Sequence, residues 1–208
     1  MEGTDDSVPT PLCAACLSGH LDVVRYLCAA GADMAKPKSD NDTPVYCAAL
    51  RGHLSIVQYL TEACFDINRA GPGHECGTPI GAAVDMGHLD VVKYLCEAGA
   101  DKHRGDKLGD CPLLLAAARG RLDHAQYLVK VGLDKNRAND QGITPLMAAA
   151  GSDQADMVAY LFGIGVDTLW ESYHGSSAKA AIGWARRRAR TQARARDYEI
   201  LDRIFQHI

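Results

Sequence analysis

Small apolar, larger apolar and polar positions follow one another along this chain in a pattern that recurs five times. Each copy opens with a run of small apolar residues, as in Ala48-Ala49, and passes through a turn into a second apolar segment. In the first copy, the apolar residues of this second segment fall at the spacing of one helix face, namely Val23, Val24, Leu27 and Cys28. A polar stretch of about ten residues follows each copy. The pattern predicts pairs of short helices joined by polar loops.

A Thr-Pro start signal places the copies in register. It recurs after 33, 35, 33 and 33 positions, with Cys replacing Thr once, at Thr10, Thr43, Thr78, Cys111 and Thr144. Thr at a helix N-cap accepts a hydrogen bond from a free backbone N–H, and Pro at the first helical position has no N–H to leave unpaired. A helix is therefore expected to begin after each signal. Four glycines are expected to end second helices in the left-handed conformation: Gly31, Gly99, Gly132 and Gly165.

The 33-residue unit resembles the ankyrin repeat, which begins with Thr-Pro-Leu-His-x-Ala and consists of a β-turn and two helices. The resemblance covers Thr10 to about Ser176. It implies an all-α fold, an ankyrin-repeat solenoid of stacked helix-turn-helix units with β-turn or hairpin loops. The expected organisation is an N-terminal lead-in over 1–9, repeats over 10–42, 43–77, 78–110, 111–143 and 144–176, and an Arg-rich helical cap over 177–208.

The sequence departs from the ankyrin pattern in four respects. The His of the start motif is replaced in every copy, by Cys13, Tyr46, Gly81, Leu114 and Met147. The second loop, within 69–76, is two residues longer, so its tip is expected to project differently. Cys64 stands where other copies end the second helix with Gly, which predicts local backbone strain. The segment 177–181 matches the start motif only loosely, so a sixth unit is expected as a degenerate terminal cap.

Composition and charge place the chain among soluble globular proteins. Hydrophobic residues make up 47% and charged residues 23%, which excludes disordered, collagen-like and membrane classes. The net charge of −4 hides an asymmetry, because residues 176–208 carry a net charge of +5 and the rest −9. No apolar run approaches the roughly 18 residues of a membrane helix, and the acidic N-terminus lacks the features of a secretory signal. We expect a soluble intracellular protein of the cytoplasm, although a transit peptide removed before Met1 would leave no trace of import into an organelle.

Few residues offer catalytic or metal-binding chemistry. Cys13, Cys16 and His20 form a Cys-x2-Cys-x3-His run, but no second ligand pair lies at zinc-binding spacing. We interpret these cysteines, and others within the helices, as small hydrophobic core residues with free thiols. His20, His53 and His88 repeat at equivalent positions, which favours a structural role in the turns. The sequence has no Ser-His-Asp order, phosphate-binding loop or dinucleotide-binding Gly motif, so we expect no enzymatic activity, metal, cofactor or small-molecule substrate.

The ankyrin resemblance implies that a partner protein binds the concave face, which loop tips and the exposed ends of the first helices form. Mapped onto this sequence, that face comprises Leu50, Arg51, His74, Glu75, Asp85, Met86, Lys107, Leu108, Arg119, Trp170, Tyr173 and His174. Trp170, Tyr173 and His174 stand out, because aromatic residues dominate interface hot spots. The competing interpretation is that Trp170 packs against the C-terminal helix.

The C-terminal segment carries an apolar stripe at helical spacing, formed by Ala185, Ala189, Ala193, Ile200, Ile204 and Ile208. Arginines occupy the remaining face. They form either a solvated cap on the last repeat or an anion-binding surface made of Arg186, Arg187, Arg188, Arg190 and Arg194. Because the segment has no aromatic stacking platform or groove-reading motif, nucleic acid and anionic lipid are disfavoured as partners.

Three hypotheses of function follow from these patterns. The first is a non-enzymatic protein–protein interaction module or scaffold that binds a partner on its concave face. The second is a structural subunit built permanently into a larger multiprotein assembly. The third is an anion or nucleic-acid binder that uses the Arg-rich helix, and a steep loss of affinity with salt would distinguish it.

Overall fold

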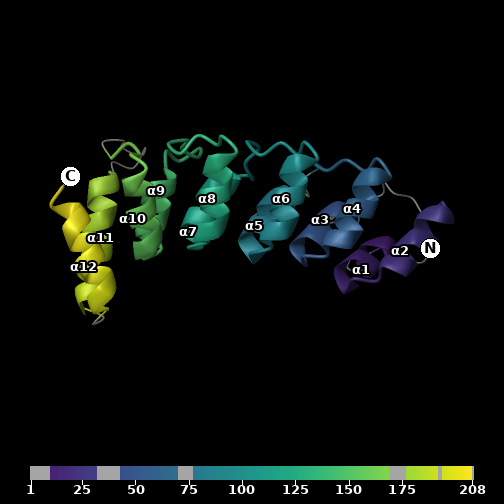
Figure 1. The fold of residues 1–208 in the computed structure, drawn as a ribbon, viewed down its shortest axis with the longest axis horizontal. Coiled ribbons are helices and arrows are strands. Elements are labelled where there is room, and N and C mark those ends of the chain that lie inside the picture. Colours follow the sequence, from purple (N-terminus) through teal and green to yellow (C-terminus); the bar gives the residue numbers. More distant parts are fainter. Residues whose placement is uncertain (1–9, 32–42, 70–76, 169–176, 192–193, 208) are drawn as a thin grey trace, which may run out of the picture. The chain divides into compact units, whose positions relative to one another are not determined.

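The computed structural model describes residues 10–31, 43–69, 77–168, 177–191 and 194–207. In those ranges the regular elements are α-helices, which follow one another in pairs (Figure 1). The chain divides into two compact units, Met1–Lys107 and Leu108–Ile208. The first unit holds α1 (Pro11–Ser18), α2 (Leu21–Ala29), α3 (Pro44–Leu50), α4 (Leu54–Glu62), α5 (Pro79–Met86) and α6 (Leu89–Glu97). The second holds α7 (Pro112–Ala118), α8 (Leu122–Lys130), α9 (Pro145–Gly151), α10 (Ala155–Gly163), α11 (Ala178–Thr191) and α12 (Ala195–Phe205).

The first helix of each repeat begins at the start signal, as predicted. Four Thr hydroxyls accept a hydrogen bond from the backbone N–H three residues further on, at 3.2, 3.1, 3.2 and 3.4 Å for Thr10, Thr43, Thr78 and Thr144. A proline follows each of them as the first helical residue. α7 begins after Cys111 without a side-chain cap. Because the start signal determines where each first helix begins, it also determines which residues stand near the end of that helix.

The first helices pack side by side within each unit. α3 lies between α1 and α5 in the N-terminal unit, and α9 lies between α7 and α11 in the C-terminal unit. Their interior positions hold small residues, of which Ala48, Ala49, Ala82 and Ala83 are fully buried. Small side chains let neighbouring helices approach closely. The predicted stacking of the inner helices is thus present within each unit.

The turn between the two helices of a pair is held by a residue of the next repeat. The His53 ring lies over Gly19, where a Cβ atom would come within 2.6 Å of the ring. Its Nε2 donates a hydrogen bond to the Leu17 carbonyl oxygen at 3.2 Å. The His88 ring covers Gly52 in the same way. The predicted structural role of these two histidines in the turns is confirmed.

The C-terminal segment is a sixth helix pair, α11 and α12, with a longer first helix. Ser177 stands 33 residues after Thr144, and its hydroxyl accepts from the Ala180 N–H at 3.2 Å, as the Thr caps do. α11 has 14 residues against 7 in α9, and seven residues are close to two helical turns, so the longer helix keeps its phase. Arg194 precedes α12 with φ −86° and ψ 76°, close to −88° and 74° for Gln154 before α10. The C-terminal segment thus contains a helix pair in the register of the repeats.

Part of the predicted apolar stripe forms the core of this cap. Ala185, Ala189 and Ile204 are buried, and Ile200 is half-buried. Ala193 and Ile208 lie outside the described residues. α11 packs on α9 and α12 packs on α10, so the buried stripe joins the cap to the fifth repeat. No helix within the described ranges has the length and apolar character needed to cross a membrane.

Two residues other than glycine hold a positive φ within the described ranges. Cys64 has φ +62° after α4, where Gly99 has φ +85° after α6, so Cys64 adopts the left-handed backbone on which the prediction of strain rests. Asp153 has φ +60° in the turn after α9, and this conformation was not predicted. Asp adopts left-handed backbone more readily than most residues. Asp153 therefore places a carboxylate in the turn after α9.

Candidate functional site

The ends of α3 and α5 form the predicted surface of the N-terminal unit. Leu50 is the half-buried last residue of α3, and Arg51 follows it as an exposed C-cap. Met86 is the last residue of α5 and is 47% exposed. Because His88 lies over Gly52, the two helix ends are neighbours. Arg51 and Met86 therefore offer a cation and an apolar side chain at adjacent helix ends.

Asp85 is not part of the accessible surface. The prediction of an exposed carboxylate is wrong at this position, because Asp85 is only 6% exposed. It stands seven residues after its Thr cap, the register that the half-buried Leu50 has in α3, on a flank of the helix that neighbouring residues cover. A side chain buried to this degree belongs to the packed fold.

Lys107 and Leu108 stand at a loop tip where one unit ends and the next begins. Both are exposed, Leu108 at 51%. The Leu108 carbonyl oxygen accepts a hydrogen bond from the Asp140 N–H at 3.0 Å. Close by, Nδ2 of Asn139 donates to the Asp110 carboxylate at 2.6 Å. Successive loops of the C-terminal unit thus hold each other, and the Leu108 side chain stays open to solvent on a fixed backbone.

The predicted surface has six further residues, of which the structure describes one. Arg119 is the exposed C-cap of α7. The other five lie outside the described residues, namely His74, Glu75, Trp170, Tyr173 and His174. The competing interpretation, in which Trp170 packs against the C-terminal helix, also falls outside them. Partner contact at these positions stays a prediction.

Trp184 is an exposed aromatic residue that the sequence analysis did not select. It lies on α11 and is 52% exposed. It stands seven residues after Ser177, the register of the half-buried Leu50 after Thr43 and of the buried Asp85 after Thr78, and unlike these two residues it is exposed. Extension of the 33-residue period to Ser177 would have found Trp184. The loose match of the sixth start motif concealed this register.

Arg186 joins the two helices of the cap. Its guanidinium forms an ion pair with Asp202 and donates a hydrogen bond to the Tyr198 hydroxyl at 3.5 Å. It also lies 5.5 Å from the Tyr198 ring centre and 5.2 Å from that of Phe205, within the range of cation–π attraction. Burial by itself lowers the pKa of Arg186, but the hydrogen bonds to Tyr198 and Asp202 outweigh it and raise the pKa. Arg186 is therefore engaged inside the cap.

Arg188 and Arg194 attach the cap to the fifth repeat through Asp153. Arg188 Nη2 lies 2.8 Å from the Asp153 carboxylate and donates to the carbonyl oxygens of Ala150 and Gly151 at 3.2 and 3.0 Å. Arg194 lies 3.0 Å from the same carboxylate. The last carbonyls of a helix have no partner within it, so Arg188 satisfies two of them at the end of α9. These contacts favour the structural cap interpretation for both arginines.

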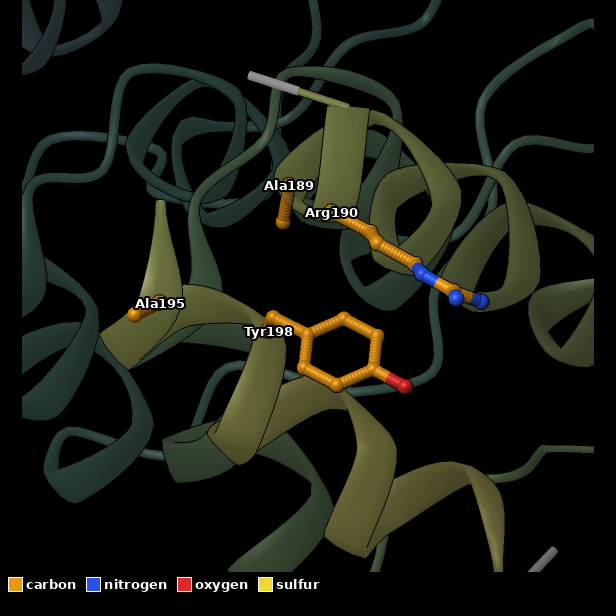
Figure 2. Close-up of a pocket in the computed structure, with 4 residues that line it drawn as sticks. All are labelled: Ala189, Arg190, Ala195 and Tyr198. Carbon is orange, nitrogen blue, oxygen red and sulfur yellow. The ribbon is translucent and has the colours of Figure 1, made fainter. Parts of the chain in front are cut away.

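Arg187 and Arg190 are exposed, and neither forms an ion pair with another residue in the described part of the chain. Arg190 borders a shallow pocket of about 260 Å³ together with Ala189, Ala195 and Tyr198 (Figure 2). Figure 2 shows the Arg190 side chain and the Tyr198 hydroxyl extending toward the same side. The four lining residues include no carboxylate, thiol or imidazole. The pocket suits a small apolar group rather than acid–base or nucleophilic chemistry.

Two thiols of the first repeat, Cys13 and Cys16, are buried. Cys13 and Cys16 are at most 1% exposed, whereas His20 of the same run is exposed. Burial raises the pKa of the Cys16 thiol, and nearby Cys13 and Cys28 raise it further. A protonated thiol is a poor nucleophile and a poor metal ligand, which supports the packing interpretation. In the parts of the chain that the structure describes, no group of three His, Cys, Asp or Glu side chains is placed to hold a metal ion.

Helix pairs of one repeating design, stacked within each unit, define a helical repeat protein. The family model described as ankyrin repeats (3 copies) matches residues 2–71 and 80–169. This match covers more than half of the chain, so the chain belongs to the ankyrin-repeat family, and the predicted family and all-α fold are confirmed. Ankyrin repeats are generally protein–protein interaction modules. No curated protein matches the chain.

Proposed function

We propose that this protein is a non-enzymatic interaction module that binds a partner protein through the ends of its first helices and its loop tips. The supporting observation is that large apolar side chains stay exposed at these positions, Met86 at 47% and Leu108 at 51%, and that Trp184 within α11 is 52% exposed. Burial of apolar area yields about 25 cal/mol per Å², so a partner that covers these side chains gains affinity. Arg51, Lys107 and the other cations of this surface add polar contacts around them.

The chemistry of the described residues favours binding over catalysis. Burial raises the pKa of the Cys16 thiol, which disfavours the reactive thiolate, and two turn histidines lie against glycines. The arrangement of the cap also weakens the nucleic-acid hypothesis, because Arg186, Arg188 and Arg194 already pair with carboxylates. A nucleic acid could bind these arginines and release its own counterions only after the ion pairs with the carboxylates had been broken. A partner protein on the first-helix ends leaves these contacts intact.

A photo-crosslinking amino acid placed at Arg51 or Met86 tests this proposal. Gln58 of α4 and Glu97 of α6 are exposed residues of second helices and serve as matched control positions. After irradiation of cells that produce the variants, we expect the same protein adduct from Arg51 and Met86 and none from the controls. Equal adducts from all four positions, or none from any, would contradict the proposal.

The alternative of a permanently built-in structural subunit makes a different prediction for the uncrosslinked chain. Such a subunit would stay with its partners through gel filtration and separate only in denaturant. We propose a free-standing module, so the uncrosslinked chain is expected to elute as a folded monomer. Co-elution with the crosslinked partner in every non-denaturing buffer would support the structural subunit instead.

A further inference from the structure

We infer that the open face of α11 binds an acidic segment of the partner protein, with Trp184 as the apolar anchor and Arg187 as the ion-pairing group. This inference rests on the proposed function. It specifies the chemical character of the partner segment that binds the C-terminal unit. Three observations carry it: the exposure of Trp184, the open space at the end of α9, and the pairing of the surrounding arginines.

Trp184 lies on the face of α11 that its neighbours leave open. Ile182 and Ala185, on the packed face of α11, are at most 1% exposed, whereas Trp184 is 52% exposed. Tryptophan is among the side chains with the largest apolar area, and folded proteins usually bury most of it. A rigid aromatic side chain on a packed helix loses little conformational entropy on binding, which is why such residues dominate interface hot spots.

The end of α9, on which α11 packs, leaves room for a partner side chain. Arg188 follows Trp184 by four residues on the same face of α11, and it donates a hydrogen bond to the Gly151 carbonyl oxygen at 3.0 Å. This bond joins α11 to the end of α9. A Cβ atom at Gly151 would meet no atom within 4 Å. The surface at Gly151 is therefore open to a side chain of a partner that contacts α11.

Arg187 gives this face its preference for an acidic partner. It follows Trp184 by three residues, is exposed, and forms no ion pair with the described part of the chain. Arg188 and Arg194, in contrast, are both paired with Asp153. The segment 176–208 carries a net charge of +5, and a positive surface attracts acidic segments and rejects basic ones. A single exposed aromatic ring suits an apolar side chain better than the successive bases of a nucleic acid, which need several rings.

Selection from a random peptide library displayed on phage tests the inference on the intact chain. We expect the enriched peptides to place an apolar residue among Asp and Glu residues. By fluorescence polarisation, Trp184→Ala is expected to weaken their binding about tenfold or more, and Arg187→Gln severalfold. Arg190→Gln is the matched control, because it removes the same charge from the side of α11 that faces Tyr198. It should leave the affinity within about twofold.

Several results would overturn the inference. These are the absence of any enriched peptide, enriched peptides without acidic residues, and equal binding by the parent chain and Trp184→Ala. Tighter binding of a thymidine oligonucleotide than of the peptides, lost in Arg187→Gln, would assign this face to nucleic acid. Circular dichroism should show an unchanged thermal melt for Trp184→Ala, because the side chain is exposed. Failure of peptide binding while crosslinks at Arg51 and Met86 persist would remove this inference and leave the proposed function intact.

Discussion

Cys64 shows what a side chain costs in a turn that suits glycine. It follows α4 with φ +62°, where Gly99 follows α6 with φ +85°. The Cβ of an L-residue costs about 1–2 kcal/mol in this conformation, and the greater freedom of glycine in the unfolded chain offsets about half of that. We predict that Cys64→Gly raises the free energy of unfolding by about 0.5–1 kcal/mol, measured by urea denaturation.

Cys64→Ala is the control for this prediction, because it removes the thiol and keeps the Cβ. It should leave the free energy of unfolding within about 0.3 kcal/mol of the parent. Gly99→Ala, where the new Cβ meets no atom within 4 Å, should cost about 1 kcal/mol through the backbone alone. A Cys64→Gly variant no more stable than the parent would show that the turn after α4 carries no strain.

Cys16 makes stability depend on pH. Burial, followed by the nearby Cys13 and Cys28, raises the pKa of its thiol in the folded chain. Above about pH 8.5 the unfolded chain therefore loses a proton that the folded chain keeps. The free energy of unfolding must then fall as the pH rises. We predict a smaller fall in Cys16→Ala, which carries the residue found at the equivalent Ala49. Urea denaturation at neutral and alkaline pH measures both slopes, and equal slopes would contradict the prediction.

At the scale of helix pairs, the turn before the cap is held by an ion pair, whereas the preceding turn is held by a side chain that covers a glycine. Gln154 covers Gly120 in the turn of the preceding repeat. In the cap, Arg194 stands at the position of the covering residue and Asp153 at that of the glycine, and their charged groups lie 3.0 Å apart. The strained φ of +60° at Asp153 is thus offset by ion pairs to Arg194 and Arg188.

We predict a coupling free energy of about 0.5–1 kcal/mol between Asp153 and Arg194, measured by a double-mutant cycle of urea unfolding. Asp153→Asn suits the cycle because Asn also tolerates left-handed backbone. The control is the pair of Arg196 and Asp156, 2.9 Å apart, whose side chains are 79% and 58% exposed. Its coupling should be close to zero. Equal couplings for the two pairs would contradict the role of Asp153 in attaching the cap.

α2 presents to solvent a face that the later second helices bury. Val23 is 46% exposed, whereas Val91 at the same position of the third repeat is fully buried. Tyr26 is 72% exposed, whereas Tyr59 is half-buried. The reason is visible at Tyr59, whose ring lies 5.5 Å from the guanidinium of Arg25 in the preceding repeat. No described repeat precedes the first one to cover the matching face.

A matched pair of valines tests this difference. Val91→Ala removes buried methyl groups and should lower the free energy of unfolding by about 2 kcal/mol. Val23→Ala should lower it by less than about 0.5 kcal/mol, because its side chain is largely hydrated already. Urea denaturation compares the two variants. A similar loss in both would show that the face of α2 around Val23 is covered.

The helix starts were predictable from sequence because a single Thr-Pro pair determines each of them locally. The positive φ of Cys64 followed from the repeat itself, which defines the turn. The burial of Asp85 could not be predicted from the repeat, because it depends on the side chains of neighbouring helices, which the repeat period does not determine. Trp184 escaped notice because the sixth unit lacks the Thr-Pro signal, so the 33-residue period was not extended to Ser177. The left-handed backbone of Asp153 could have been predicted, because Asp153 stands 33 residues after Gly120 in the same turn.

Across the whole molecule, helices pack mainly on their own pair and on neighbouring pairs of the same unit. In such proteins the stability is a sum of local terms from each repeat and its neighbours. Arg51 and Met86 stand at exposed helix ends, where substitutions change stability little. Variants at these positions therefore separate the effect on binding from the effect on folding.

The affinity of the purified partner for surface variants tests the central claim most directly. The protein crosslinked at Arg51 or Met86 is titrated calorimetrically into the parent chain, into a variant with both residues changed to Ala, and into a control with Gln58 and Glu97 changed to Ala. We predict binding at least about tenfold weaker for the first variant, unchanged binding for the control, and the same thermal melt for all three chains. Equal affinity for the two variants, or a loss confined to the control, would contradict the claim that the ends of the first helices bind the partner.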